Sequence, residues 1–145
     1  TGANSSALSV SVDYGALTCS LRVPPSVTIS PVNPSIMAGT TYSFTVSVTN
    51  HDPLGCGSST FTLSSLLPDG VTTTFTTAAL TIAPGQTLST TMQKAVPATY
   101  VPGTYALNAI VSSPNHNVTA SGNMTVLATT TFVGVERRDL VCCTS

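Results

Sequence analysis

The chain has 145 residues and a net charge of −1 at pH 7, so it is long enough for one hydrophobic core and too short for two domains of ordinary size. Only 6% of its residues are charged, against about 25% in an average soluble domain, while about 45 positions are serine or threonine. Four basic and five acidic residues form no clustered positive charge, which excludes a nucleic-acid-binding protein and a protein held on an anionic membrane by basic residues.

Apolar and polar residues alternate with a period of two in several short segments, which predicts strands with one buried face. The clearest segment is 42–49, where every second residue is serine or threonine. Six or seven strands follow from this pattern. In chain order the alternating apolar residues are Val27 and Ile29; Tyr42, Phe44, Val46 and Val48; Phe61 and Leu63; Leu80 and Ile82; Tyr105, Leu107, Ala109 and Val111; and Val118, Ala120, Met124 and Val126, with a break near Gly122.

Turn signals rich in proline and glycine separate these segments, as at residues 68–70 and 84–85, and no stretch has the apolar stripe of a capped helix. The spacing predicts an all-β, immunoglobulin-like antiparallel β-sandwich of about seven strands. We expect the sandwich to span residues 24–128. An N-terminal extension (1–23) and a C-terminal tail (129–145) each contain alternating apolar residues, so each tail is expected to form one more strand.

The four cysteines and three glycan acceptor motifs indicate an oxidising, extracellular setting, and we expect a secreted or cell-surface protein. The cysteines lack the C-x-x-C spacing of a zinc site. Cys142 and Cys143 are adjacent, so a bond between them would close a small strained ring. Bonds to another chain, a link to a tail of the same chain, and free thiols stay open for this pair. The acceptor asparagines are Asn4, Asn117 and Asn123.

No arrangement of residues indicates an enzyme, and no cofactor or metal ion is implied. His51 and His116 lie beside turn residues, and no Gly-x-Ser-x-Gly motif occurs. Asp52 and Asp69 are expected to form turns, and Asn50 with Asp52 gives only a weak calcium pattern. Sugar binding on exposed aromatic rings is disfavoured because the chain has no tryptophan and only Tyr14 and Tyr100 lie outside buried registers.

From Cys19 onward the chain resembles immunoglobulin-like accessory domains that stand beside catalytic domains in secreted bacterial glycosidases and metallopeptidases. The resemblance implies a non-catalytic companion domain and a Cys19–Cys56 disulfide. It departs from the family at Val71, where an aromatic residue is frequent, and after Ala128. The matching residues are Cys19, residues 25–31, 38–40 and 42–50, Cys56 with Ser59, Phe61 and Leu63, and residues 68–70, 80–85 and 102–107.

Two functions are therefore considered. The first is an extracellular structural module that associates with copies of itself in a surface filament or layer, with residues 7–13 or 130–135 adding as a strand to a neighbour's sheet. The second is an accessory domain, acting as a spacer or a substrate or carbohydrate contact, of a larger secreted hydrolase. Under these two functions, the partners of the chain would be copies of itself or neighbouring domains, with covalent glycans. No apolar run in the sequence approaches the about 20 residues of a membrane span.

Overall fold

A computed structural model describes residues 19, 21–130 and 134. This part of the chain contains nine strands and one short 3-10 turn, and none of its helical residues form a segment long enough to cross a membrane. The elements are β1 (Ser26–Ser30), β2 (Ser35–Met37), β3 (Thr41–Thr49), η1 (Leu54–Cys56), β4 (Ser59–Ser64), β5 (Thr72–Phe75), β6 (Ala79–Ile82), β7 (Thr87–Ala95), β8 (Gly103–Ser112) and β9 (Asn117–Leu127).

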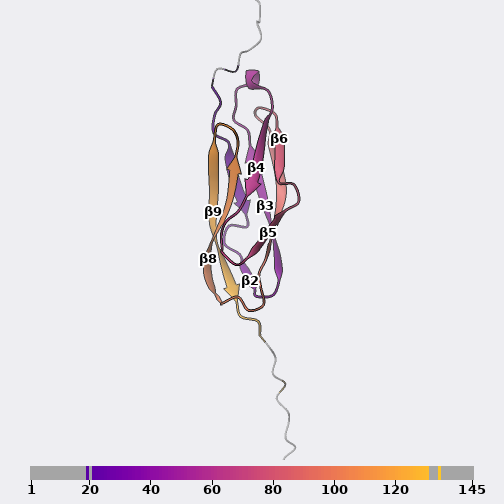
Figure 1. The fold of residues 1–145 in the computed structure, drawn as a ribbon, viewed down its shortest axis with the longest axis vertical. Helices are drawn as coiled ribbons and strands as arrows, with labels where there is room; N and C mark the ends of the chain where they lie inside the picture. The colour runs from indigo at the N-terminus through magenta and orange to yellow at the C-terminus, as the bar shows by residue number, and fades with distance from the viewer. Residues whose placement is uncertain (1–18, 20, 131–133, 135–145) are drawn as a thin grey trace, which may run out of the picture.

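The strands form two sheets packed face to face, as expected for an immunoglobulin-like sandwich (Figure 1). One sheet has four strands in the order β1-β3-β7-β5, and the other has five in the order β2-β9-β8-β4-β6. Alternate residues of each strand point into the space between the sheets. In β3, for example, Phe44, Val46 and Val48 are buried, whereas the serines and threonines between them lie on the outer face. The all-β sandwich predicted from the alternation is confirmed.

The strand count and one pairing differ from the prediction. Nine strands are present rather than about seven, because β2, β5 and β7 carry too little apolar alternation to be recognised. β2 pairs with β9 in parallel, so the five-stranded sheet is mixed rather than wholly antiparallel. At residues 31–34 the chain crosses from β1 in one sheet to β2 in the other. β2 then runs beside β9 in the same direction as β9, which makes the pairing parallel.

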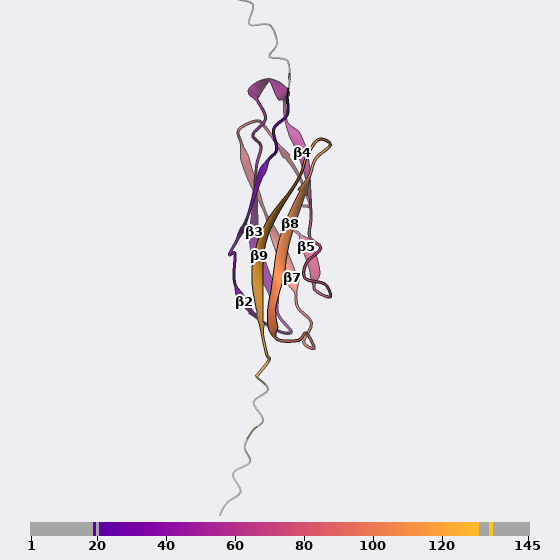
Figure 2. The same ribbon diagram turned by 90° about the vertical axis from the view of Figure 1, so that its left-hand side faces the viewer.

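The described chain enters and leaves the sandwich at opposite ends of its long axis (Figure 2). We call the end that holds Cys19, η1 and the β8–β9 turn the N-terminal pole. The other end, where β2 and β9 finish, is the C-terminal pole. Most of each tail falls outside the described residues, so the strands expected at 7–13 and 130–135, and the boundaries at 23 and 129, stay predictions.

A buried lysine fixes the segment that crosses from β4 to β5. Lys94 points inward from β7, and its side chain is fully buried. Its Nζ donates hydrogen bonds to Ser65 Oγ (2.6 Å), the carbonyl oxygen of Leu67 (2.7 Å) and Thr73 Oγ1 (2.7 Å). Burial lowers the pKa of Lys94 from 10.5 to about 8. Three neutral oxygens thus satisfy the amine and hold the crossing segment against the four-stranded sheet.

Candidate functional site

A groove of about 710 Å³ lies at the N-terminal pole. We call it the pole groove. Its walls are the first half of β4, the β8–β9 turn, and the segment that precedes β1. Six of the thirteen lining residues carry a hydroxyl group, and the charged side chains are one arginine and one aspartate. The lining residues are Arg22, Val23, Asp52, Ser58, Ser59, Thr60, Phe61, Thr62, Ser112, Ser113, Pro114, Asn115 and His116.

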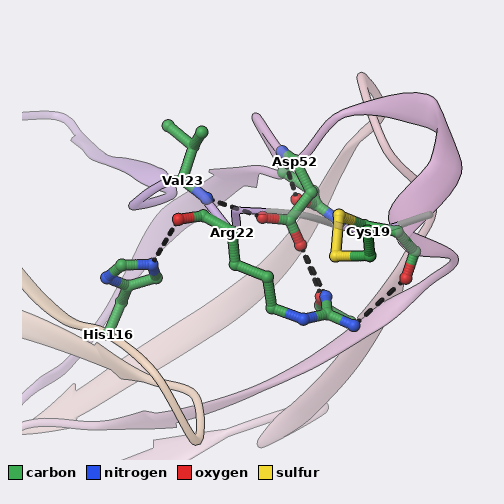
Figure 3. The surroundings of a disulfide bond; sticks show 8 residues. Cys19, Arg22, Val23, Asp52 and His116 are labelled. Carbon is green, nitrogen blue, oxygen red and sulfur yellow. Dashed lines mark hydrogen bonds and ion pairs between the residues drawn. A yellow bond between two sulfur atoms is a disulfide. The ribbon is translucent and has the colours of Figure 1, made fainter. Parts of the chain in front are cut away.

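An ion pair between Arg22 and Asp52 forms the inner wall of the groove (Figure 3). The guanidinium lies 2.7 Å from Asp52 Oδ2 and also donates to Ser59 Oγ and to the carbonyl oxygen of Cys56. Asp52 further accepts hydrogen bonds from the backbone N–H of Val23 (2.9 Å) and from Ser59 Oγ (2.8 Å). The pair therefore joins the segment before β1 to the loop between β3 and β4.

The environment of Asp52 favours its charged form. Burial alone would raise the pKa of this carboxyl. The hydrogen bonds from Val23, Ser59 and Arg22, together with the positive charge of Arg22, outweigh burial and hold the pKa below its ordinary value of 3.8. Asp52 is thus a buried carboxylate with its oxygens occupied by donors of the protein, not the simple turn former that the Asp-Pro sequence predicts.

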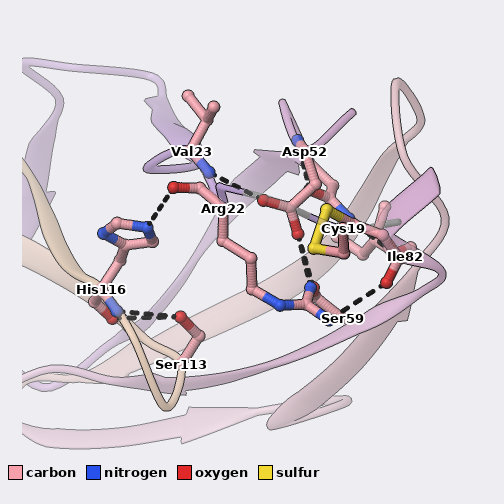
Figure 4. Close-up of polar contacts among 10 residues, drawn as sticks. Cys19, Arg22, Val23, Asp52, Ser59, Ile82, Ser113 and His116 are labelled. Carbon is pink, nitrogen blue, oxygen red and sulfur yellow. Dashed lines mark hydrogen bonds and ion pairs between the residues drawn. A yellow bond between two sulfur atoms is a disulfide. The ribbon is translucent and has the colours of Figure 1, made fainter. Parts of the chain in front are cut away.

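Two further side chains complete the polar network around this pair (Figure 4). Asn50 is fully buried; its Nδ2 donates to the carbonyl oxygen of Ile82 and its Oδ1 accepts from the N–H of Asp52, both at 2.9 Å. His116 Nε2 lies 3.1 Å from the carbonyl oxygen of Arg22. The oxygens of Asn50 and Asp52 are therefore committed to protein donors, and no group of three metal-ligating side chains occurs among the described residues.

The disulfide implied by the family resemblance is present at this pole. Cys19 and Cys56 are bonded, 37 positions apart in sequence, and Cys56 is buried. The bond ties the segment before β1 to η1, beside the Arg22–Asp52 ion pair (Figure 3). A disulfide is consistent with an extracellular location. Covalent and ionic links thus hold the same two segments together.

In the part of the chain that the structure describes, the wall formed by β4 has a free strand edge. β4 pairs with β6 along residues 59–62, but its pairing with β8 covers only Thr62, Leu63 and Ser64, because β8 ends at Ser112. Among the described residues, the first half of β4 therefore has hydrogen-bonded strand neighbours on one side only. Its other side faces the pole groove. An unpaired edge of this kind offers backbone donors and acceptors to an extended segment.

Catalytic machinery is not assembled in the part of the chain that the structure describes. His51 Nε2 lies 2.9 Å from Ser26 Oγ, but both side chains are exposed and no hydrogen bond orients the other ring nitrogen of His51. A nucleophile and base without an orienting group or an oxyanion site do not form a working triad. The amine of Lys94 is buried in the interior.

The remaining predicted site residues are separated from the groove or lie outside the described residues. Asn117 and Asn123 are exposed on β9 and project from the same face of that strand, since they are six positions apart. Asn4, Cys142 and Cys143 fall outside the described residues. Tyr100, a candidate sugar platform, packs half-buried against the core. Its ring lies 4.9 Å from that of Tyr105, and its hydroxyl donates to the carbonyl oxygen of Asp69 at 2.6 Å.

Sequence reasoning missed Arg22, Lys94 and the structural role of Asp52. Only four charged side chains lie in the described part of the chain: Arg22, Asp52, Asp69 and Lys94. In a chain with so few charged residues, the single arginine and the single lysine of the described part indicate specific roles. Neither residue has a sequence neighbour that reveals its partner.

The fold is similar to that of several solved proteins, although no protein-family model and no curated protein sequence matches the chain. A family 123 glycoside hydrolase from Clostridium perfringens matches 73% of this chain at a TM-score of 0.55 and 11% identity, and the match spans only 28% of the hydrolase. A FixG-related protein from Vibrio parahaemolyticus matches 74% of this chain and 98% of its own, at 0.52 and 12% identity.

The CARDB domain of a Pyrococcus furiosus protein, solved with di-metal ions, matches 78% of this chain and 95% of its own, with a TM-score of 0.52 and 16% identity. These similarities establish the immunoglobulin-like fold. At such low identity they establish the fold alone.

Proposed function

We propose that this chain is a non-catalytic structural module of an extracellular filament or layer, in which copies join end to end through their terminal segments. The observation that carries the proposal is that the described chain enters and leaves an elongated sandwich at opposite poles (Figure 2). A contact between one pole and the next copy's opposite pole is heterologous, so it repeats without closing and builds a linear array.

The scarcity of charge supports association between identical copies. Of the four charged side chains in the described residues, Arg22 and Asp52 pair with each other and Lys94 is buried, which leaves Asp69 as the exposed and unpaired charge. Identical proteins of high net charge repel one another. The described surface of this chain provides almost no such repulsion, whereas its hydroxyl groups can hydrogen-bond to water or to a neighbour.

Two links at the N-terminal pole would keep the entering segment in place when a neighbouring copy is attached to it or exerts force on it. The Cys19–Cys56 disulfide and the Arg22–Asp52 ion pair both tie the entering segment to the loop between β3 and β4. A module that transmits force along its long axis needs such an anchor where the chain enters. Glycans on Asn117 and Asn123, and bonds between copies through Cys142 and Cys143, belong to the same proposal.

Sedimentation velocity over a wide range of protein concentration tests the proposal. We expect the average mass of the full chain to rise with concentration, with a frictional ratio that increases as rods lengthen. A chain that stays monomeric at all concentrations would exclude a self-associating module.

A second candidate is an accessory domain of a larger secreted hydrolase. The similarity to a segment that makes up 28% of a glycoside hydrolase chain favours it, as does the resemblance of the sequence to such accessory domains. The intact mass of the native polypeptide separates the two functions. A mass far above 14.7 kDa, beyond what glycans add, would favour the accessory domain.

A further inference from the structure

The direction of the backbone N–H and carbonyl groups of β4 shows which of them face the pole groove. The N–H of Leu63 donates to the carbonyl oxygen of Ala78, on the β6 side of the strand. Because backbone groups of successive residues point to opposite sides of a strand, odd-numbered residues of β4 face β6 and even-numbered residues face β8. Thr62 and Ser64 pair with β8, but Thr60 lies beyond the end of that strand.

The peptide groups of Thr60 therefore face the pole groove without a strand partner. Among the described residues, no backbone or side-chain hydrogen bond involves the N–H or carbonyl oxygen of Thr60 on that side. The groove beside it is large enough for several residues of an extended chain. An added strand would continue the five-stranded sheet in line with β8 and satisfy both groups.

The C-terminal segment 129–135 has the composition for this role. It reads Thr-Thr-Thr-Phe-Val-Gly-Val, with β-branched and aromatic residues and without charge or proline, and the charged run begins only at Glu136. The groove likewise presents hydroxyl groups and a neutral ion pair, so an uncharged strand meets no unpaired charge there. Strand-forming tendency and charge both match.

Geometry requires that this segment comes from another copy. β9 has 11 residues and separates the groove from the C-terminal pole by about 35 Å. From Leu127, an extended chain reaches only about 26 Å by residue 135, and it would first have to reverse direction. The two poles lie at opposite ends of the sandwich (Figure 1). In an end-to-end array, the C-terminal pole of one copy would therefore face the N-terminal pole of the next.

We infer that the pole groove is a strand-acceptor site that takes residues 129–135 of a second copy, paired with the free edge of β4 at Thr60. This inference rests on the proposed function, because it names the joint between copies. The inference also gives a reason for the short pairing of β4 with β8, which leaves the edge of β4 at Thr60 without a described strand partner.

A pair of proline substitutions isolates the free edge. Thr60→Pro removes the N–H that faces the groove but no β4–β6 hydrogen bond, because odd-numbered residues make those bonds. Thr81→Pro is the matched control, since the N–H of Thr81 faces away from β4 on the outer edge of β6. Both variants also lose the contact between Thr60 Oγ1 and Thr81 Oγ1 (3.0 Å).

In sedimentation velocity on the full chain, Thr60→Pro is expected to weaken self-association by at least about tenfold, while Thr81→Pro leaves it unchanged. Equal association constants for wild type and Thr60→Pro would overturn the inference but leave the proposed function standing. Absence of association in the wild type would instead overturn the proposed function itself.

Hydrogen exchange at the Thr60 amide gives a second measurement that does not depend on how the proline variants fold. The amide is expected to exchange slowly in concentrated wild-type protein and quickly after dilution to monomers. A synthetic peptide of residues 129–135 should compete with assembly and restore protection to this amide. Fast exchange in the assembled state, or competition by a peptide of residues 7–13 instead, would contradict the assignment.

Discussion

The carbonyl oxygen of Val32 lies 2.5 Å from the position that a Cβ atom would occupy at Gly122. Val32 belongs to the segment that crosses from β1 to β2, and it passes directly over β9, where it accepts a hydrogen bond from the N–H of Asn123 at 3.2 Å. The glycine that interrupts the alternation of β9 in the sequence is therefore the place where the chain passes between the two sheets. Close backbone approach is a common reason for glycine within a strand.

Gly122→Ala is expected to destabilise the protein by about 1–3 kcal/mol, because a backbone atom must move to admit the methyl group. Gly103→Ala is the matched control: a Cβ there meets the Tyr105 ring at 3.6 Å, an ordinary contact. This variant should be unchanged or stabilised by less than about 1 kcal/mol. Urea unfolding of both variants measures the difference, and equal losses would contradict the role of Val32.

The ion pair at the N-terminal pole predicts coupling between Arg22 and Asp52. In a double-mutant cycle with Arg22→Met and Asp52→Asn, the coupling free energy should be about 1–3 kcal/mol, since the carboxylate is buried and the arginine is only 32% exposed. Additive losses would show that the two side chains act independently.

The stability of the protein at acidic pH should depend on the Asp52 carboxylate. The pKa of Asp52 is lower in the folded protein than in the unfolded chain, so the stability it contributes is present above about pH 4 and is lost as the pH falls through the folded value. Asp52→Asn should therefore lose less stability than wild type between neutral pH and strongly acidic pH.

The Cys19–Cys56 disulfide closes a loop across 37 positions, and its removal should cost about 4 kcal/mol in the chain-entropy description. A Cys19→Ser, Cys56→Ser double variant compared with the oxidised wild type in thermal unfolding measures this loss. The single Cys19→Ser variant should lose as much, since Cys56 then has no partner. A double variant as stable as wild type would show that the ion pair alone holds the entering segment.

Lys94 predicts an unusual dependence of stability on alkaline pH. Its pKa is about 8 in the folded protein and near 10.5 in the unfolded chain, so the unfolded chain binds more protons between these values. The free energy of unfolding contributed by this residue therefore rises as the pH increases from about 8 to 10.5. Lys94→Met should lack this rise. Parallel pH curves for the two proteins would contradict a buried amine with a lowered pKa.

The sequence predicts those parts of the fold whose alternation is apolar, and fails where inward positions are polar or few. β3 was identified because Phe44, Val46 and Val48 all point inward. In β7 the inward residues are Thr90, Met92 and Lys94. Because two of these three are polar, the strand shows no alternation of apolar and polar residues. β2 has only three residues, too few to show a period.

The candidate site was only partly predictable for a similar reason. The Cys19–Cys56 bond followed from the family resemblance. The groove, the ion pair and the free edge of β4 depend on where β8 ends relative to β4, and on contacts between residues 30 or more positions apart. No local pattern in the sequence carries that information.

Electron microscopy of the full chain at high concentration tests end-to-end assembly most directly. The account predicts unbranched rows of particles whose repeat equals the long axis of one sandwich, and the rows should shorten when Thr60 is replaced by proline but not when Thr81 is. Dispersed single particles, or pairs joined side by side through their sheet faces, would contradict it.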